Sequence, residues 1–220
     1  MATDLHSIKS QFSVWRGWYG RFLPKDRSAR ILDLGCGRGG MVHWLQSLGY
    51  ASAEGIDISR ESIQNGIDLG IRNIHHGDAV SFLKDKRECY DAILLVDVLG
   101  FLIKDEIPEI LKAVAASLRT GGVVIARVSN AESPMTSKLR YEHSREETRF
   151  TEMNLKETLE RSGFKNVGAY PVRPVIHGVV SFIRYCLWRV VEGGLKCYRL
   201  IEAGSPSGVF TQNMIVVGRR

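Results

Sequence analysis

Short apolar runs alternate with longer segments of helical period along most of the chain. Seven of the runs are predicted to be strands: residues 30–34, 53–58, 71–75, 90–96, 123–128, 166–172 and 209–218. Helices are expected between them, for example over residues 40–48, 105–118 and 151–162. This alternation predicts an α/β fold built on one doubly wound, seven-stranded and mostly parallel sheet.

Two segments stand outside the alternation. Residues 1–29 precede the first strand and are expected to form an N-terminal helical cap. Residues 174–203 separate the last two strands, and their apolar side chains recur at close to a 3.6-residue period between basic residues. This pattern predicts an amphipathic helical insert in a single domain of 220 residues. Its longest uncharged run, 174–183, is far shorter than the ~20 residues that cross a bilayer.

The first strand runs into a glycine-rich turn that fits two binding motifs. Gly35-x-Gly37-x-x-Gly40 has the spacing of a dinucleotide fingerprint, which alone is a weak signal. Asp33 adds an acid two residues before the first glycine, which would repel a pyrophosphate but attract a sulfonium or an ammonium group. Arg38 would instead suit a phosphate. The turn by itself leaves both cofactors open.

The acids that follow the next strands favour the cationic cofactor. Asp57 ends the second strand, Asp78 follows the third and Asp97 follows the fourth. This ordered series, with Asp33-x-Gly35-x-Gly37-x-Gly39 before it and Leu118-Arg119-Thr120-Gly121-Gly122 after it, resembles the class I S-adenosylmethionine-dependent methyltransferases. The resemblance extends over roughly residues 30–220 and depends on the whole series.

The resemblance implies S-adenosylmethionine as cofactor and a set of residues that line its pocket. The strand-end residues and their neighbours in this set are Asp33, Gly35, Gly37, Asp57, Ile58, Asp78, Ala79 and Asp97. Ile58 and Ala79 would flank the adenine. Arg16 and Tyr19 of the N-terminal cap are expected to close over the methionine carboxylate. The alternative for Asp78 or Asp97 alone is a turn residue that caps the next helix.

A catalytic base is harder to place. Many small-molecule members of the family carry a Glu-His pair after the fourth strand, and Gly100-Phe101 stands at those positions here. The long connection 129–149 is the next place to look, and we interpret His143 or Glu142 as the base, with Asp97 as a further catalytic candidate. A surface histidine without a role is the alternative for His143. No set of histidines suggests a metal site.

Charge and cysteine content bear on the partners and the compartment. The net charge is +6, with the basic excess in residues 1–30 and 171–220 and an acidic excess between them. An acidic centre argues against a nucleic-acid acceptor. Four cysteines without metal or disulfide spacing, and an N-terminus unlike a signal peptide, predict a cytoplasmic protein.

The acceptor is suggested by a second, narrower resemblance. The glycine turn, Phe150-Thr151-Glu152, the basic apolar insert and Phe210-Thr211-Gln212-Asn213 resemble methyltransferases of bacterial surface-polysaccharide (O-antigen) assembly. That resemblance implies methylation of a sugar hydroxyl on a lipid-linked glycan at the inner face of the plasma membrane. The apolar residues of 174–203, with arginines beside them, would allow this segment to lie in an anionic membrane interface. The alternatives are an insert that packs on the domain or forms a homodimer, a soluble small-molecule acceptor, and a non-catalytic cofactor-binding module.

Overall fold

The computed structural model describes residues 5–134 and 147–220 and contains the predicted sheet. Its strands are β1 (Ile31–Leu34), β2 (Glu54–Asp57), β3 (Ile74–His76), β4 (Tyr90–Val96), β5 (Leu118–Ser129), β6 (Lys165–Pro171) and β7 (Asn213–Arg219). They follow the order β3-β2-β1-β4-β5-β7-β6. The strands β1 to β5 pair in parallel, whereas β7 is antiparallel to both of its neighbours. The prediction of a seven-stranded, mostly parallel sheet is confirmed.

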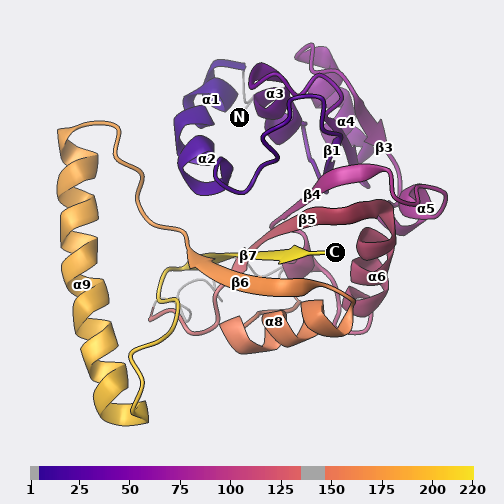
Figure 1. Cartoon of the computed structure of the whole chain (residues 1–220). Coiled ribbons are helices and arrows are strands. Elements are labelled where there is room, and N and C mark those ends of the chain that lie inside the picture. Colours follow the sequence, from indigo (N-terminus) through magenta and orange to yellow (C-terminus); the bar gives the residue numbers. More distant parts are fainter. Residues whose placement is uncertain (1–4, 135–146) are drawn as a thin grey trace.

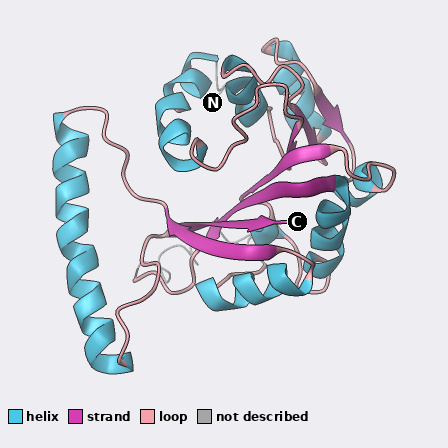
Figure 2. Cartoon of the chain, in the orientation of Figure 1, coloured by secondary structure: helices cyan, strands magenta, loops and turns pink. Residues whose placement is uncertain are grey.

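Helices cover both faces of this sheet (Figure 2). They are α1 (Leu5–Ser10), α2 (Phe12–Tyr19), α3 (Gly40–Ser47), α4 (Arg60–Asp68), α5 (Ala79–Leu83), α6 (Ile107–Ser117) and α8 (Glu152–Arg161), with a 3-10 turn η1 at Leu99–Phe101. Successive side chains of β4 point to opposite faces of the sheet and pack in two different apolar clusters. Ala92 and Leu94 join the cluster under α2 and α3, while Ile93 and Leu95 join the cluster under α6 and α8. This burial on both faces explains the continuous apolar sequence of the strand.

Two strand boundaries differ from the predicted ones for local reasons. Residues 71–73 precede β3 instead of belonging to it, because Asn73 adopts a positive φ of 59°, which an extended strand does not allow. Residues 209–212 precede β7, because the side-chain amide of Asn130 donates hydrogen bonds to the carbonyl oxygens of Val209 and Thr211 at 2.6 and 3.0 Å. These two carbonyl groups therefore bond to a side chain instead of a neighbouring strand.

The insert between β6 and β7 is one continuous helix, α9 (Val179–Ala203), rather than a helical pair packed on the domain. It stands beside the sheet at the left of Figure 1, linked to it by two extended connections. Because β6 and β5 are both antiparallel to β7, they run in the same direction. The helix therefore follows the carboxyl end of β6, at the edge of the sheet where β1, β2 and β4 also end. Within the described residues, no helix is both long and apolar enough to cross a bilayer.

Candidate functional site

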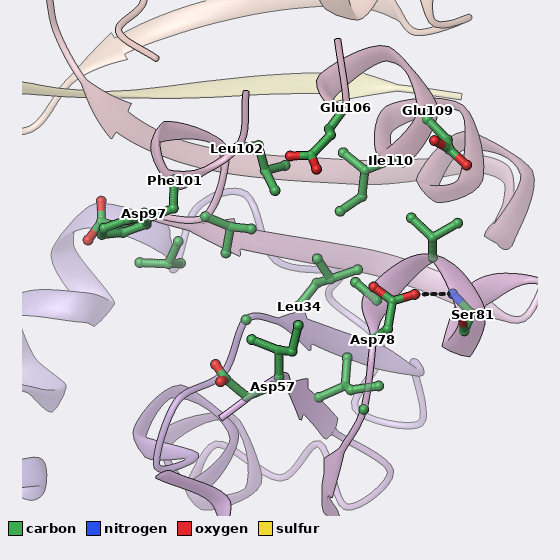
Figure 3. A pocket seen from close by; sticks show the side chains of 18 residues that line it. Leu34, Asp57, Asp78, Ser81, Asp97, Phe101, Leu102, Glu106, Glu109 and Ile110 are labelled. Carbon is green, nitrogen blue, oxygen red and sulfur yellow. Dashed lines mark hydrogen bonds between the residues drawn. The ribbon is translucent and has the colours of Figure 1, made fainter. Parts of the chain in front are cut away.

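A pocket of about 920 Å³ lies where β1, β2 and β4 end (Figure 3). Its walls come from the strand ends, from the first turn of α5, and from η1 and the start of α6. The residues predicted from the sequence that line it are Gly35, Asp57, Ile58, Asp78, Ala79 and Asp97. The carboxyl edge of a parallel sheet is the usual place for a ligand in folds of this kind.

Asp57 ties the second strand to the glycine turn. One carboxylate oxygen, Oδ2, accepts a hydrogen bond from the backbone N–H of Gly37 at 2.8 Å, and Oδ1 accepts from the N–H of Ser59 at 2.8 Å. Each oxygen keeps a second lone pair for a ligand. Gly37 has a positive φ of 55°, and a Cβ at this residue would meet no atom within 4 Å. The turn thus borders open space, and the fixed carboxylate beside it can accept from two neighbouring hydroxyl groups.

Asp78 combines the capping role and the pocket position that the sequence offered as alternatives. Its Oδ1 accepts from the N–H of Ser81 at 2.8 Å and so caps α5, while the residue also lines the pocket (Figure 3). The hydrogen bond from Ser81 lowers the pKa of Asp78 from its usual value, so the group is ionised at neutral pH. Ile58 projects nearby with 76% of its surface exposed, which provides an apolar wall for a flat ring.

Asp97 is ion-paired with Arg127, a residue that was not predicted from the sequence. Its carboxylate makes two hydrogen bonds to Arg127 of β5, one of them from Nε at 2.9 Å. Burial works against the charge of Arg127, but the bond to Asp97 keeps the pKa of the guanidinium above its ordinary value. Both carboxylate oxygens of Asp97 are engaged by Arg127, so this geometry favours a binding role for Asp97 over proton abstraction. A charged residue within the apolar strand 123–128 was the signal available in the sequence.

Asp33 and Tyr19 are buried and do not line the pocket. Asp33 is 2% exposed, and burial together with the charge of Asp57 raises its pKa to about 7. Tyr19 is fully buried, and burial raises its pKa although the positive charge of Arg127 acts in the opposite direction. Arg16 is exposed on α2 and is likewise absent from the walls of the pocket. Neither Arg16 nor Tyr19 therefore lines the pocket, although Tyr19 lies close enough to Arg127 and Asp97 for their charges to act on it.

The charge of the walls distinguishes between the two cofactor types. Five carboxylate side chains line the pocket, those of Asp57, Asp78, Asp97, Glu106 and Glu109, and no lysine, arginine or histidine does so among the described residues. Glu106 and Glu109 come from the start of α6 and were not predicted, although they stand three apart at the beginning of an expected helix. A pyrophosphate would be repelled by such walls, whereas a cationic ligand is attracted.

Comparison with known proteins agrees with this chemistry. Residues 8–169 match the sequence model of a family described as a methyltransferase domain. The chain belongs to this family. A comparison with curated proteins finds no match.

Solved structures of methyltransferases share the fold. A SAM-dependent methyltransferase from Archaeoglobus fulgidus superposes with a TM-score of 0.71 at 17% identity, covering 99% of this chain and 100% of that one. An S-adenosylmethionine-dependent methyltransferase from Mesorhizobium loti gives 0.64 at 16% identity, covering 94% and 98%. Phosphoethanolamine N-methyltransferase 2 from Haemonchus contortus, in complex with S-adenosyl-L-methionine, gives 0.63 at 13%, covering 98% and 57%. At these identities the likeness concerns the Rossmann-like fold.

The catalytic base of this methyltransferase stays a prediction. His143 and Glu142 lie outside the described residues. Gly100 and Phe101, at the positions of the Glu-His pair of other members, belong to η1, and Phe101 lines the pocket. The carbonyl oxygen of Gly100 accepts from the N–H groups of Glu147 and Thr148 at 2.8 and 3.0 Å. Residues 147 and 148, at the end of the connection after β5, therefore contact η1 next to the pocket.

Proposed function

We propose that this methyltransferase binds S-adenosylmethionine in the pocket at the ends of β1, β2 and β4 and transfers its methyl group to a hydroxyl group. The observation that carries this proposal is Asp57, which lines a pocket whose described charged side chains are all acidic and accepts a hydrogen bond from the backbone of Gly37 in the neighbouring turn. The pair offers a fixed acceptor for vicinal hydroxyls next to an open backbone turn. The acids favour a cofactor with an ammonium and a sulfonium group over a dinucleotide.

In this proposal, different pocket residues bind different parts of the cofactor. When bound, the cofactor supplies a methyl group made electrophilic by its sulfonium. Asp57 accepts hydrogen bonds from the two ribose hydroxyls, and Asp78 accepts from the adenine amino group. Ile58 and Ala79 lie against the base, while Phe101 and Leu102 reduce access of water to the pocket. Holding the two reactants in line supplies roughly 7–11 kcal/mol in well-oriented systems.

The acceptor in this proposal is a sugar hydroxyl of a lipid-linked bacterial polysaccharide intermediate, and the enzyme acts at the cytoplasmic face of the plasma membrane. Two features support it. The sequence resembles the polysaccharide methyltransferases in the glycine turn and around Phe150-Thr151-Glu152. In addition, α9 lies at the same edge of the sheet as the pocket. His143 or Glu142 would take the proton of the hydroxyl.

One observation favours a second candidate, a module that binds the cofactor without turnover. Gly100-Phe101 replaces the Glu-His pair, and Asp97 is engaged by Arg127, so neither position supplies an unpaired base. A soluble small-molecule acceptor is the remaining alternative within the enzyme class.

Transfer of radiolabel separates these candidates. Protein is incubated with S-adenosylmethionine labelled in the methyl group and with lipid-linked glycan extracted from bacterial membranes. We expect label in the glycan, and we expect His143→Ala to slow turnover about 10²-fold while S-adenosylhomocysteine affinity stays unchanged. Label only in a soluble extract would point to a small-molecule acceptor. Cofactor binding without transfer of label in either extract would support the second candidate, a module that binds the cofactor without turnover.

A further inference from the structure

The helix α9 presents an apolar half to the solvent. At about 100° per residue, the arc from Phe182 round to Val191 covers about half of the helix circumference and contains no charged residue. Its large side chains are all 49–81% exposed: Val179, Val180, Phe182, Ile183, Leu187, Val190, Val191, Tyr198, Leu200 and Ile201. An exposed apolar surface of this extent is typical of an interaction site rather than of a bare protein surface.

The opposite half of α9 is fastened to the domain by ion pairs. Glu192 is only 5% exposed, and its carboxylate pairs with Arg173 at 2.7 Å. The carbonyl group of Arg173 in turn accepts from the indole N–H of Trp18 in α2 at 2.9 Å. Further along, Arg199 pairs with Glu132 at 3.5 Å. The helix is thus oriented with its ion-paired side toward the domain, so the apolar half described above stays turned away from it.

Basic residues flank the apolar arc, and the positive excess lies at one of its two borders. Arg184 lies at one border, and Arg189 and Lys196 lie at the other. The last two pair with Glu192 at 3.6 and 3.5 Å, but this single carboxylate is shared with Arg173 as well. Three cations on one acid leave an excess of positive charge at this second border, whereas Glu202 lies at the same border as Arg184 and offsets its charge. A second copy of α9 would bring like charges together, whereas an anionic surface matches them.

We propose that α9 lies in the plane of an anionic lipid surface, with its apolar half in the interface and its basic border of Arg189 and Lys196 at the headgroups. Its 25 residues correspond to a contact about 37 Å long. Because α9 stands at the edge of the sheet where the pocket lies, this contact would bring the pocket's edge of the domain to the membrane. That use of the contact rests on the proposed function, whereas the lipid binding itself does not.

The test compares two exposed apolar sites. In Leu187→Glu/Val190→Glu, two acids replace side chains at the centre of the arc that are 62% and 74% exposed, so the fold is not disturbed. The matched control is Met153→Glu, at an equally exposed apolar position (70%) on α8. Co-sedimentation is measured with vesicles of equal parts phosphatidylcholine and phosphatidylglycerol, and with phosphatidylcholine alone. Each arc substitution removes the burial of one aliphatic side chain, so the double variant should bind about 100-fold more weakly.

We expect the parent protein and Met153→Glu to bind the anionic vesicles, and binding to fall with added salt and in pure phosphatidylcholine. Equal binding by the double variant would overturn the assignment to α9. No vesicle binding by the parent, or a parent dimer in sedimentation velocity that the double variant dissociates, would show that lipid is not the occupant. The vesicles contain no acceptor or cofactor, so failure here leaves the methyl-transfer proposal standing.

Discussion

At the scale of single residues, a buried acid near this site destabilises the fold when it is ionised, and a bound cation would reduce that destabilisation. Asp33 is the clearest example, since it is 2% exposed and has Asp57, which lines the pocket, as a negative neighbour. Burial and this neighbour raise its pKa to about 7. A buried acid of this kind destabilises the fold when ionised, and a cationic cofactor in the pocket would relieve part of the cost.

The substitution Asp33→Asn should remove a pH-dependent destabilisation. Because the folded pKa is raised above the unfolded value, the folded protein binds the proton more tightly, and stability falls as pH rises from about 4 to about 7. The variant should therefore gain about 1–3 kcal/mol in free energy of unfolding at about pH 8 and almost nothing at about pH 4. Urea unfolding at both pH values measures this. A gain that is equal at both would contradict the raised pKa.

At the scale of elements, the first turn of α5 joins stability to binding. Asp78 caps this helix and also lines the pocket, so its two contributions need to be separated. The helix α8 offers a match, because the hydroxyl of Thr151 accepts from the N–H of Asn154 at 3.1 Å and caps that helix away from the pocket.

We predict different outcomes for the two caps. Asp78→Ala and Thr151→Ala should each lower the free energy of unfolding by about 1 kcal/mol, the usual value of an N-cap. Only Asp78→Ala should also weaken S-adenosylhomocysteine binding, because the Asp78 side chain faces the pocket. Thermal unfolding and calorimetry provide the two readouts. Equal affinity in both variants would limit Asp78 to its capping role.

Over the whole molecule, the sequence predicts the strand order and the strand-end acids better than it predicts the other pocket residues and the orientation of α9. The order of strands and the acids at their ends follow from apolar periodicity and from the meeting of parallel strand ends at one edge. Arg127, Glu106 and Glu109 were missed, because their proximity to the pocket depends on how β5 and α6 pack. The helical period of residues 174–203 indicated α9, but the outward direction of its apolar half is set by the distant pair Arg173–Glu192.

The binding of S-adenosylhomocysteine to parent protein and to Asp57→Ala, measured by calorimetry, tests the central claim most directly. The matched control is Asp68→Ala, an exposed acid of α4 that contacts Gln64 and does not line the pocket. We expect binding by the parent and the control, and a loss of about 1–3 kcal/mol in Asp57→Ala, because ribose acceptors disappear. Absence of binding by the parent, or its binding of NADH in place of S-adenosylhomocysteine, would contradict the account.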